Sequence, residues 1–180
     1  MTSVLRVPGR DVGVVDGEVD LDFIDRRIGY LFVKFDRTDD CVLTTVDAGR
    51  TWRPAALPAL TSMSNGAGVV YALTAATEHR RQHVFRSRAG STHWTRLGVK
   101  AGTVDRSADV ATSSDAVALL RTGDDGPHPV RLGRLLVSED RGHRFVRRAN
   151  PCTAADGGAA LISITRNDPQ RLMLDCYNGE

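Results

Sequence analysis

Short apolar runs separated by Gly, Asp, Asn and Pro recur along the chain. Val19, Leu21 and Phe23 alternate with Asp20 and Asp22, which is the period-two pattern of a half-buried β-strand. Other runs of strand-forming composition lie at residues 30–35, 42–46, 69–75, 84–87, 116–120, 135–138, 160–165 and 172–176. No segment keeps the apolar spacing of an amphipathic helix. The pattern predicts an all-β chain of many short strands: a sandwich, a barrel or a propeller.

An internal repeat decides among these architectures. The motif Ser/Thr-x-Asp-x-Gly-x-x-aromatic occurs in two good copies: box one, residues 45–52, with Thr45, Asp47, Gly49, Thr51 and Trp52; and box three, residues 138–145, with Ser138, Asp140, Gly142 and Phe145. Box two, residues 87–94, keeps Ser87 and Trp94 but has Ala89 and Ser91 in place of the Asp and the Gly. The three boxes start 42 and then 51 residues apart, at 45, 87 and 138. This is about the length of a four-stranded propeller blade.

Each element of the box suits a tight chain reversal between two antiparallel strands. The Asp carboxylate can accept hydrogen bonds from backbone N–H groups of its own turn. The Gly can adopt a positive φ that other side chains resist. The aromatic side chain then begins the outgoing strand and covers the apolar side of the hairpin.

These residues resemble the Asp-box, or BNR, repeat of sialidases, sortilin-type propellers and photosystem-assembly-type propellers. The resemblance extends to residues 19–25 and 29–32 before box one, and to residues 167–172, which are similar to a turn between the first two strands of a blade. It implies a β-propeller of four-stranded antiparallel blades, with about three and a half to four blades present. The blades are expected at about 18–58, 61–98, 106–149 and 158–180, within a single domain of residues 1–180. In this family the box lies at the periphery, so Asp47 and Asp140 are expected to be structural.

Closure of the propeller is open at this point, because propellers have about four to eight blades. The favoured interpretation is a fragment of a longer propeller or a divergent short member. The second is a ring completed by a homo-oligomer, since unpaired strand edges invite association. The third is that residues 1–16 supply closing strands for the fourth blade.

One segment suggests an enzyme. Arg6, Val7 and Pro8 resemble the Arg-Ile-Pro motif of sialidases, in which the Arg binds the substrate carboxylate through its bidentate guanidinium. Sialidases also need a Tyr nucleophile with a nearby Glu, an acid/base Asp and further arginines. No such set is recognisable here, so an exposed strand residue is the favoured interpretation of Arg6.

The net charge and the lengths of the apolar runs limit the kinds of partner that the sequence indicates. A formal net charge of +2 does not demand a nucleic-acid partner, and the Arg and His residues near boxes two and three are expected to be solvated hairpin surface. No apolar run approaches the ~20 residues of a membrane span, and residues 1–10 lack the apolar core of a signal peptide. A soluble chain is expected, with its compartment undetermined.

The cysteines and the remaining polar segments add little chemistry. The favoured interpretation of the three cysteines is that all are buried thiols. The alternative is a disulfide between Cys152 and Cys176 in an oxidising compartment, which would leave Cys41 as a thiol. No metal or cofactor site is predicted, since the acidic residues between 11 and 25 lack calcium-loop spacing. The small residues at 62–68 are expected to form a turn. The sequence therefore favours a non-catalytic propeller that binds a protein or glycan, with a sialidase-like glycoside hydrolase, or a truncated relative of one, as the alternative.

Overall fold

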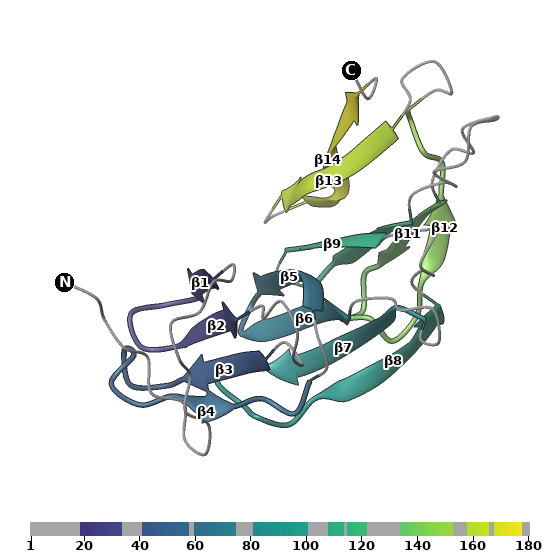
Figure 1. Ribbon diagram of the computed structural model, residues 1–180. Helices are drawn as coiled ribbons and strands as arrows, with labels where there is room; N and C mark the ends of the chain where they lie inside the picture. The colour runs from purple at the N-terminus through teal and green to yellow at the C-terminus, as the bar shows by residue number, and fades with distance from the viewer. Residues whose placement is uncertain are drawn as a thin grey trace. The chain divides into compact units, whose positions relative to one another are not determined.

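The regular elements of the chain are β-strands. The computed structural model describes residues 19–33, 41–57, 60–74, 81–100, 108–113, 115–121, 134–152, 158–165 and 168–177. The strands in these ranges (Figure 1) are β1 Val19–Phe23, β2 Gly29–Val33, β3 Cys41–Thr45, β4 Arg53–Pro54, β5 Leu60–Gly66, β6 Val69–Thr74, β7 His83–Arg88, β8 Thr95–Lys100, β9 Ala108–Thr112, β10 Val117–Arg121, β11 Arg134–Ser138, β12 Val146–Arg148, β13 Gly158–Thr165 and β14 Asp168–Tyr177.

The strands form successive antiparallel sheets in which chain neighbours are sheet neighbours. The sheets are β1–β4, β5–β8 and β9–β12, each with four strands, and the two-stranded β13–β14. In β2, Leu31 lies between Leu21 of β1 and Leu43 of β3. Such up-and-down sheets have the construction of propeller blades, and we name them blades 1 to 4 in this order. The predicted fold class, an all-β chain of propeller-type blades, is confirmed.

The chain divides into two compact units. Unit 1 comprises Met1–Leu60 and Ser87–Trp94, and unit 2 comprises Thr61–Arg86 and Thr95–Glu180. The tip of the β7–β8 hairpin therefore belongs with blade 1, whereas the rest of blade 2 belongs with blades 3 and 4. The single domain expected from the sequence remains a prediction.

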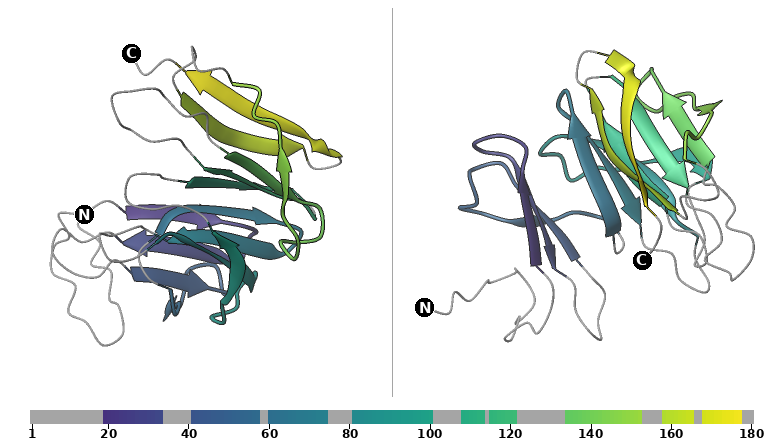
Figure 2. Two further views of the ribbon diagram at one scale, coloured as in Figure 1. Left: turned by 90° about the vertical axis from the view of Figure 1, so that its right-hand side faces the viewer. Right: turned by 90° about the horizontal axis from the view of Figure 1, so that it is seen from above.

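Apolar side chains pack between successive blades of unit 2. In Figure 2 the β13–β14 hairpin lies along the sheet β9–β12, and β13 contacts β9 and β10. One cluster joins blades 2 and 3, and its members include Tyr71, Leu73, Val84, Leu97, Val117, Leu119, Leu136 and Phe145. A second joins blades 3 and 4, with Ala118, Leu120, Leu135, Val137, Cys152, Leu172 and Leu174 among its members. Burying each large aliphatic side chain contributes roughly 1.5–3 kcal/mol, so these layers hold the blades together.

The prediction of a turn at residues 62–68 is wrong for most of that segment. Residues up to Gly66 belong to β5, and only the following pair reverses the chain, with Ala67 at φ 47° and Gly68 at φ 74°. The Ser62 hydroxyl donates to Asp109 Oδ1 at 2.8 Å, and the Ser64 hydroxyl lies 2.9 Å from the Thr112 hydroxyl. Because β5 bonds to β9 through these hydroxyls, it carries small polar residues instead of the apolar alternation that marks other strands.

Some strands lie outside the apolar runs of the sequence, namely β4, β5, β8, β9 and β12. Outer strands such as β12 are exposed along their length, so they lack a buried face that would impose alternation. The suggested closing strands of residues 1–16 lie outside the described residues. None of the described segments forms a helix long and apolar enough to cross a bilayer.

Candidate functional site

Each box forms the loop between the third and fourth strands of its blade. In box one the Thr45 hydroxyl donates to Asp47 Oδ1 at 2.8 Å and accepts the Gly49 N–H at 3.0 Å. The same carboxylate accepts the Thr51 N–H at 2.9 Å and, through Oδ2, the Thr51 hydroxyl at 2.6 Å. Asp47 therefore bonds both arms of the loop to each other.

Box three repeats this network. The Ser138 hydroxyl donates to Asp140 Oδ1 at 2.6 Å and accepts the Gly142 N–H at 2.8 Å. Asp140 Oδ1 also accepts the Arg144 N–H at 2.9 Å. Arg144 stands where box one has Thr51, so the extra hydroxyl bond to the carboxylate has no counterpart here.

A main-chain hydrogen bond fixes each of these boxes to its own blade. The Ala48 N–H donates to the Arg27 carbonyl in the β1–β2 turn, and the Arg141 N–H donates to the Asp115 carbonyl before β10, both at 2.9 Å. These donors have positive φ, 62° at Ala48 and 58° at Arg141. The sequence predicted a left-handed backbone only at the following glycine, yet two successive residues adopt it.

Box two closes by different bonds. Gly90 has φ 77° and lies one position earlier than the glycine of the other boxes. With no carboxylate at Ala89, the Ser87 hydroxyl donates to the His93 carbonyl at 2.6 Å and the Ser91 hydroxyl accepts the His93 N–H at 3.0 Å. Ser91 thus accepts a backbone N–H from the outgoing arm of the loop, as Asp47 does in box one.

The box aromatics lie against aromatic or apolar neighbours. Within unit 1, Trp52 meets Phe23 edge to face with ring centres 6.4 Å apart, and Trp94 meets Tyr30 at 6.1 Å. The Tyr30 hydroxyl also accepts the Gly90 N–H at 2.9 Å. Within unit 2, Phe145 packs against the cluster around Tyr71 and Leu73. Each box aromatic is therefore packed against side chains of its own unit.

The hydrogen bonds to the box carboxylates stabilise their charged forms. Bonds from the Thr51 hydroxyl and N–H and from the Thr45 hydroxyl lower the pKa of Asp47 to about 2. The Ser138 hydroxyl, followed by the Arg144 N–H, lowers the pKa of Asp140. Such values suit carboxylates that remain ionised; a general acid would need a raised pKa.

We expect the boxes to lose their stabilising effect in acid. Both folded pKa values lie below the unfolded value of about 3.9, so the carboxylates stabilise the folded chain above about pH 4. This contribution is lost as the pH falls through the folded pKa, about 2 for Asp47. Urea unfolding of the wild type and of the double variant Asp47→Asn, Asp140→Asn should differ most near pH 6 and least near pH 2. A difference that is the same at both ends of this range would contradict the assignment.

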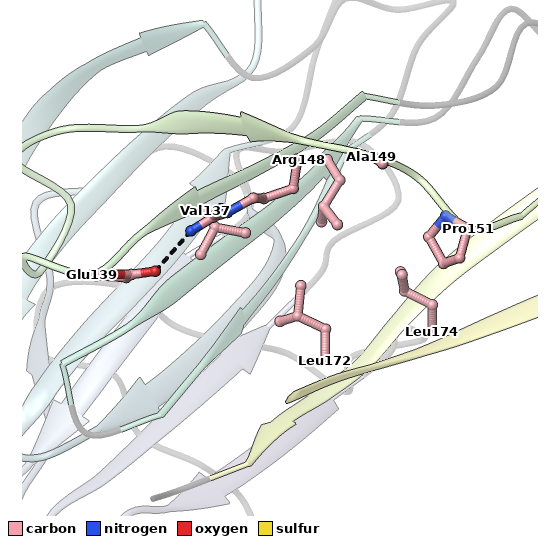
Figure 3. Close-up of a pocket in the computed structure, with 8 residues that line it drawn as sticks. Val137, Glu139, Arg148, Ala149, Pro151, Leu172 and Leu174 are labelled. Atoms are coloured by element: carbon pink, nitrogen blue, oxygen red, sulfur yellow. Dashed lines mark hydrogen bonds and ion pairs between the residues drawn. The ribbon is translucent and has the colours of Figure 1, made fainter. Parts of the chain in front are cut away.

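A pocket of about 300 Å³, lined by both aliphatic and charged side chains, lies between blades 3 and 4 (Figure 3). All its lining residues belong to unit 2: Leu135, Val137, Glu139, Arg148, Ala149, Pro151, Leu172 and Leu174. The leucines of β14 point towards the side chains of β11 and β12 in the close-up. The volume is at the low end of ligand pockets, which span about 300–1,000 Å³.

One ion pair lines the pocket. Arg148 Nη2 lies 2.9 Å from Glu139 Oε1, and both side chains are 49% exposed. Because this pair is half in solvent, it contributes little to stability. It leaves a planar guanidinium beside an aliphatic surface.

A strand edge and a disulfide border the same region. Within the described part of the chain β14 pairs with β13 alone, so its other edge presents backbone donors and acceptors next to the pocket. Cys152, which is 2% exposed, is joined to Cys176 at the end of β14. The bridge thus holds β14 to the segment that follows β12.

Comparison with known proteins adds no family. No protein-family model and no curated protein matches the chain. A solved structure described as "YCF48 bound to D1 peptide" matches with a TM-score of 0.49 and 16% identity over 74% of this chain. The match spans 42% of that other chain, so this chain covers less than half of its length. The sheets of the chain itself, not this likeness, identify its fold.

The sequence-based site residues have different outcomes. Arg6 lies outside the described residues, so its expected place as an exposed strand residue and the alternative sialidase-like role both stay predictions. The box residues lie in three separate hairpins, one in each four-stranded sheet. No group of three or more His, Cys, Asp or Glu residues suited to a metal occurs in the described ranges. The sequence interpretation missed the pocket, although the alternation of Leu172 and Leu174 with exposed Arg171 and Met173 was a usable signal.

Proposed function

We propose that the chain is a non-catalytic propeller module of the Asp-box (BNR) type that binds a protein partner at the pocket between blades 3 and 4. The observation that carries this proposal is the pairing of a pocket of mixed aliphatic and charged lining with the adjacent edge of β14. A strand edge offers main-chain hydrogen bonds to an extended peptide, and an adjoining pocket selects its side chains.

The chemistry of the pocket favours a polypeptide over a glycan. Leu172 and Leu174 are partly exposed and supply the aliphatic surface beside buried Leu135 and Val137. The charged groups that line the pocket are already bonded to each other. Sugar hydroxyls transferred to such a surface would lose hydrogen bonds to water without replacement. An apolar side chain of a peptide gains free energy there in proportion to its buried area.

The boxes support a binding role for the chain because they stiffen it without supplying chemistry. Their carboxylates are held by several hydrogen bonds each and are bonded within their own loops. A rigid scaffold lowers the entropy cost of binding. The proposal predicts no turnover of sialosides by the purified chain.

A strand-forming peptide tests the proposal. The probe is a fluorescein-labelled peptide Lys-(Val-Thr)₃-Lys, whose valines would face the pocket while its backbone pairs with β14. Fluorescence anisotropy should show saturable binding to the full chain. Leu174→Asp, which places a charge in the pocket, should weaken binding at least about tenfold.

Met173→Asp is the matched control. Met173 adjoins Leu174 but points to the opposite face of β14, since side chains alternate along a strand, and it is 58% exposed. This variant should bind like the wild type, and near-UV circular dichroism should show that both variants fold. Absence of binding, or equal loss in both variants, rules the pocket out as the site.

A further inference from the structure

We propose that the disulfide between Cys152 and Cys176 is a site of S-thiolation, at which a small thiol exchanges into the bridge and stays attached to Cys176. Cys152 is released in the same step as a buried thiol. The modification weakens binding at the pocket between blades 3 and 4. This last part rests on the proposed function, because it regulates that same site.

The two cysteines of the bridge differ in their access to solvent. Cys152 is 2% exposed and packs in the cluster that contains Leu135 and Val137. Cys176 lies near the end of β14 and is exposed. A thiolate must approach the disulfide sulfur that it attacks, so an incoming thiol reaches Cys176 and not Cys152.

The exchange step is balanced without an added oxidant or reductant. The thiolate of a low-molecular-weight thiol, such as glutathione, forms a bond to Cys176 Sγ, and the bond between the two cysteine sulfurs breaks. The electron pair of that bond leaves on Cys152 Sγ, which takes a proton from water. The products are a mixed disulfide at Cys176 and a thiol at Cys152.

The surroundings of Cys152 preserve the mixed disulfide. Reversal needs a thiolate at Cys152, and an apolar cluster disfavours an unpaired charge. The neutral thiol suits this place, because a cysteine thiol packs as a small apolar side chain. The same surroundings slow the departure of Cys152 Sγ in the forward step, so we expect exchange over minutes to hours.

The bridge lies at one end of the pocket. Pro151 immediately precedes Cys152, Leu174 lies two residues before Cys176, and both Pro151 and Leu174 line the pocket. Figure 3 shows these two lining residues at the end of the pocket away from Glu139. Opening the bridge removes the covalent link between the two segments that form this end.

Blade 4 keeps other contacts with blade 3 when the bridge is open. Leu172 and Leu174 pack on the apolar cluster of blade 3, and β13 contacts β9 and β10. The modified chain should therefore stay folded while β14 becomes more mobile, which raises the entropy cost of binding. We expect the Val-Thr peptide to bind the S-thiolated chain about fivefold more weakly than the bridged chain.

Reduced glutathione is the probe for the site. The full chain with its bridge intact is incubated with glutathione, exchange is stopped with acid, and the unfolded chain is alkylated with N-ethylmaleimide. Peptide mapping by mass spectrometry should find glutathione on Cys176 and the maleimide on Cys152. Cys41 lies outside the bridge and should carry the maleimide at every time point. Glutathione on Cys152, equal labelling of the two bridge cysteines, or no adduct in the folded chain overturns the inference.

Two single variants of the full chain are matched controls, because both lack the bridge. Cys152→Ser leaves the thiol of Cys176, and Cys176→Ser leaves the thiol of Cys152. In the folded chain, the remaining thiol of Cys152→Ser should react with oxidised glutathione at least about tenfold faster than that of Cys176→Ser. Circular dichroism checks that both variants fold, and equal rates contradict the assignment of Cys176 as the accessible sulfur.

Fluorescence anisotropy with the Val-Thr peptide separates this inference from the proposed function. Equal binding to the bridged and the glutathionylated chain overturns the link between the modification and the pocket. If the peptide binds but no adduct forms at Cys176, the S-thiolation is wrong and the proposed function stands. If the adduct forms at Cys176 and the peptide binds neither form, the proposed function is wrong and the modification site stands.

Discussion

Gly66→Ala is expected to lower the free energy of unfolding of unit 2 by about 3 kcal/mol. A Cβ atom at this position would lie 1.8 Å from the Ser113 carbonyl oxygen and 2.7 Å from its carbon. Both atoms belong to the backbone, so no side-chain rotation relieves the overlap. The start of blade 2 must move away from blade 3, which would stretch the nearby bond between Ser64 and Thr112.

Alanine substitutions at two other glycines are the controls for Gly66→Ala. Gly68 has φ 74° and no atom within 4 Å of its added Cβ, so Gly68→Ala should cost about 1 kcal/mol for the left-handed backbone alone. Gly98 has open space and no such φ, so Gly98→Ala should change stability by less than about 0.5 kcal/mol. Urea unfolding followed by circular dichroism gives the order. If Gly66→Ala is no worse than Gly68→Ala, the close approach of β5 to Ser113 is wrong.

Replacing the disulfide by two serines is expected to cost about 2–4 kcal/mol. The bridge joins Cys152 and Cys176 across a sequence separation of 24 residues, and in the loop-closure model it stabilises mainly by restricting the unfolded chain. In the folded chain it keeps β14 against blade 3. The variant Cys152→Ser, Cys176→Ser should therefore also bind the Val-Thr peptide more weakly.

Reductant provides the control for the disulfide. The wild type unfolded in the presence of a phosphine reductant should approach the stability of the double serine variant, and the variant should not respond to the reductant. A wild type that is equally stable with and without reductant would show that the bridge does not stabilise the chain. Cys41 lies outside the bridge and is half-buried, so its thiol is present under both conditions.

The local motif made the hairpins predictable, because the bonds that form them are local. Asp47 bonds to Thr45 and Thr51, which are two and four residues away. The spacing of residues along the sequence is therefore enough to predict this loop. In box two, the shift of the glycine to Gly90 was visible in the sequence, but its meaning depends on the hydroxyls that replace the missing carboxylate.

The rest depended on contacts between distant residues. β5 could not be predicted from apolar alternation, because Ser62 and Ser64 satisfy their hydroxyls on β9. The pocket joins Leu135 with Leu172, and no local pattern states that those strands face each other. The disulfide could not be predicted either, because the sequence does not state whether the compartment is oxidising. The structure shows that Cys152 and Cys176 lie close enough to be joined.

The main-chain bonds from Ala48 to Arg27 and from Arg141 to Asp115 form in both boxes, although only Arg141 adds a side-chain ion pair to its partner, with Arg141 Nη2 2.6 Å from Asp115 Oδ1. A methyl group and a long cation therefore occupy the same place in two hairpins with the same result. Residues that tolerate the left-handed backbone of this position (φ 62° at Ala48 and 58° at Arg141) should leave the geometry intact, so the loop tips can vary in surface chemistry within that limit. A protein engineer could exploit the same tolerance, using the tips as mounting points for reporter groups or recognition sequences while the blades beneath them stay unaltered.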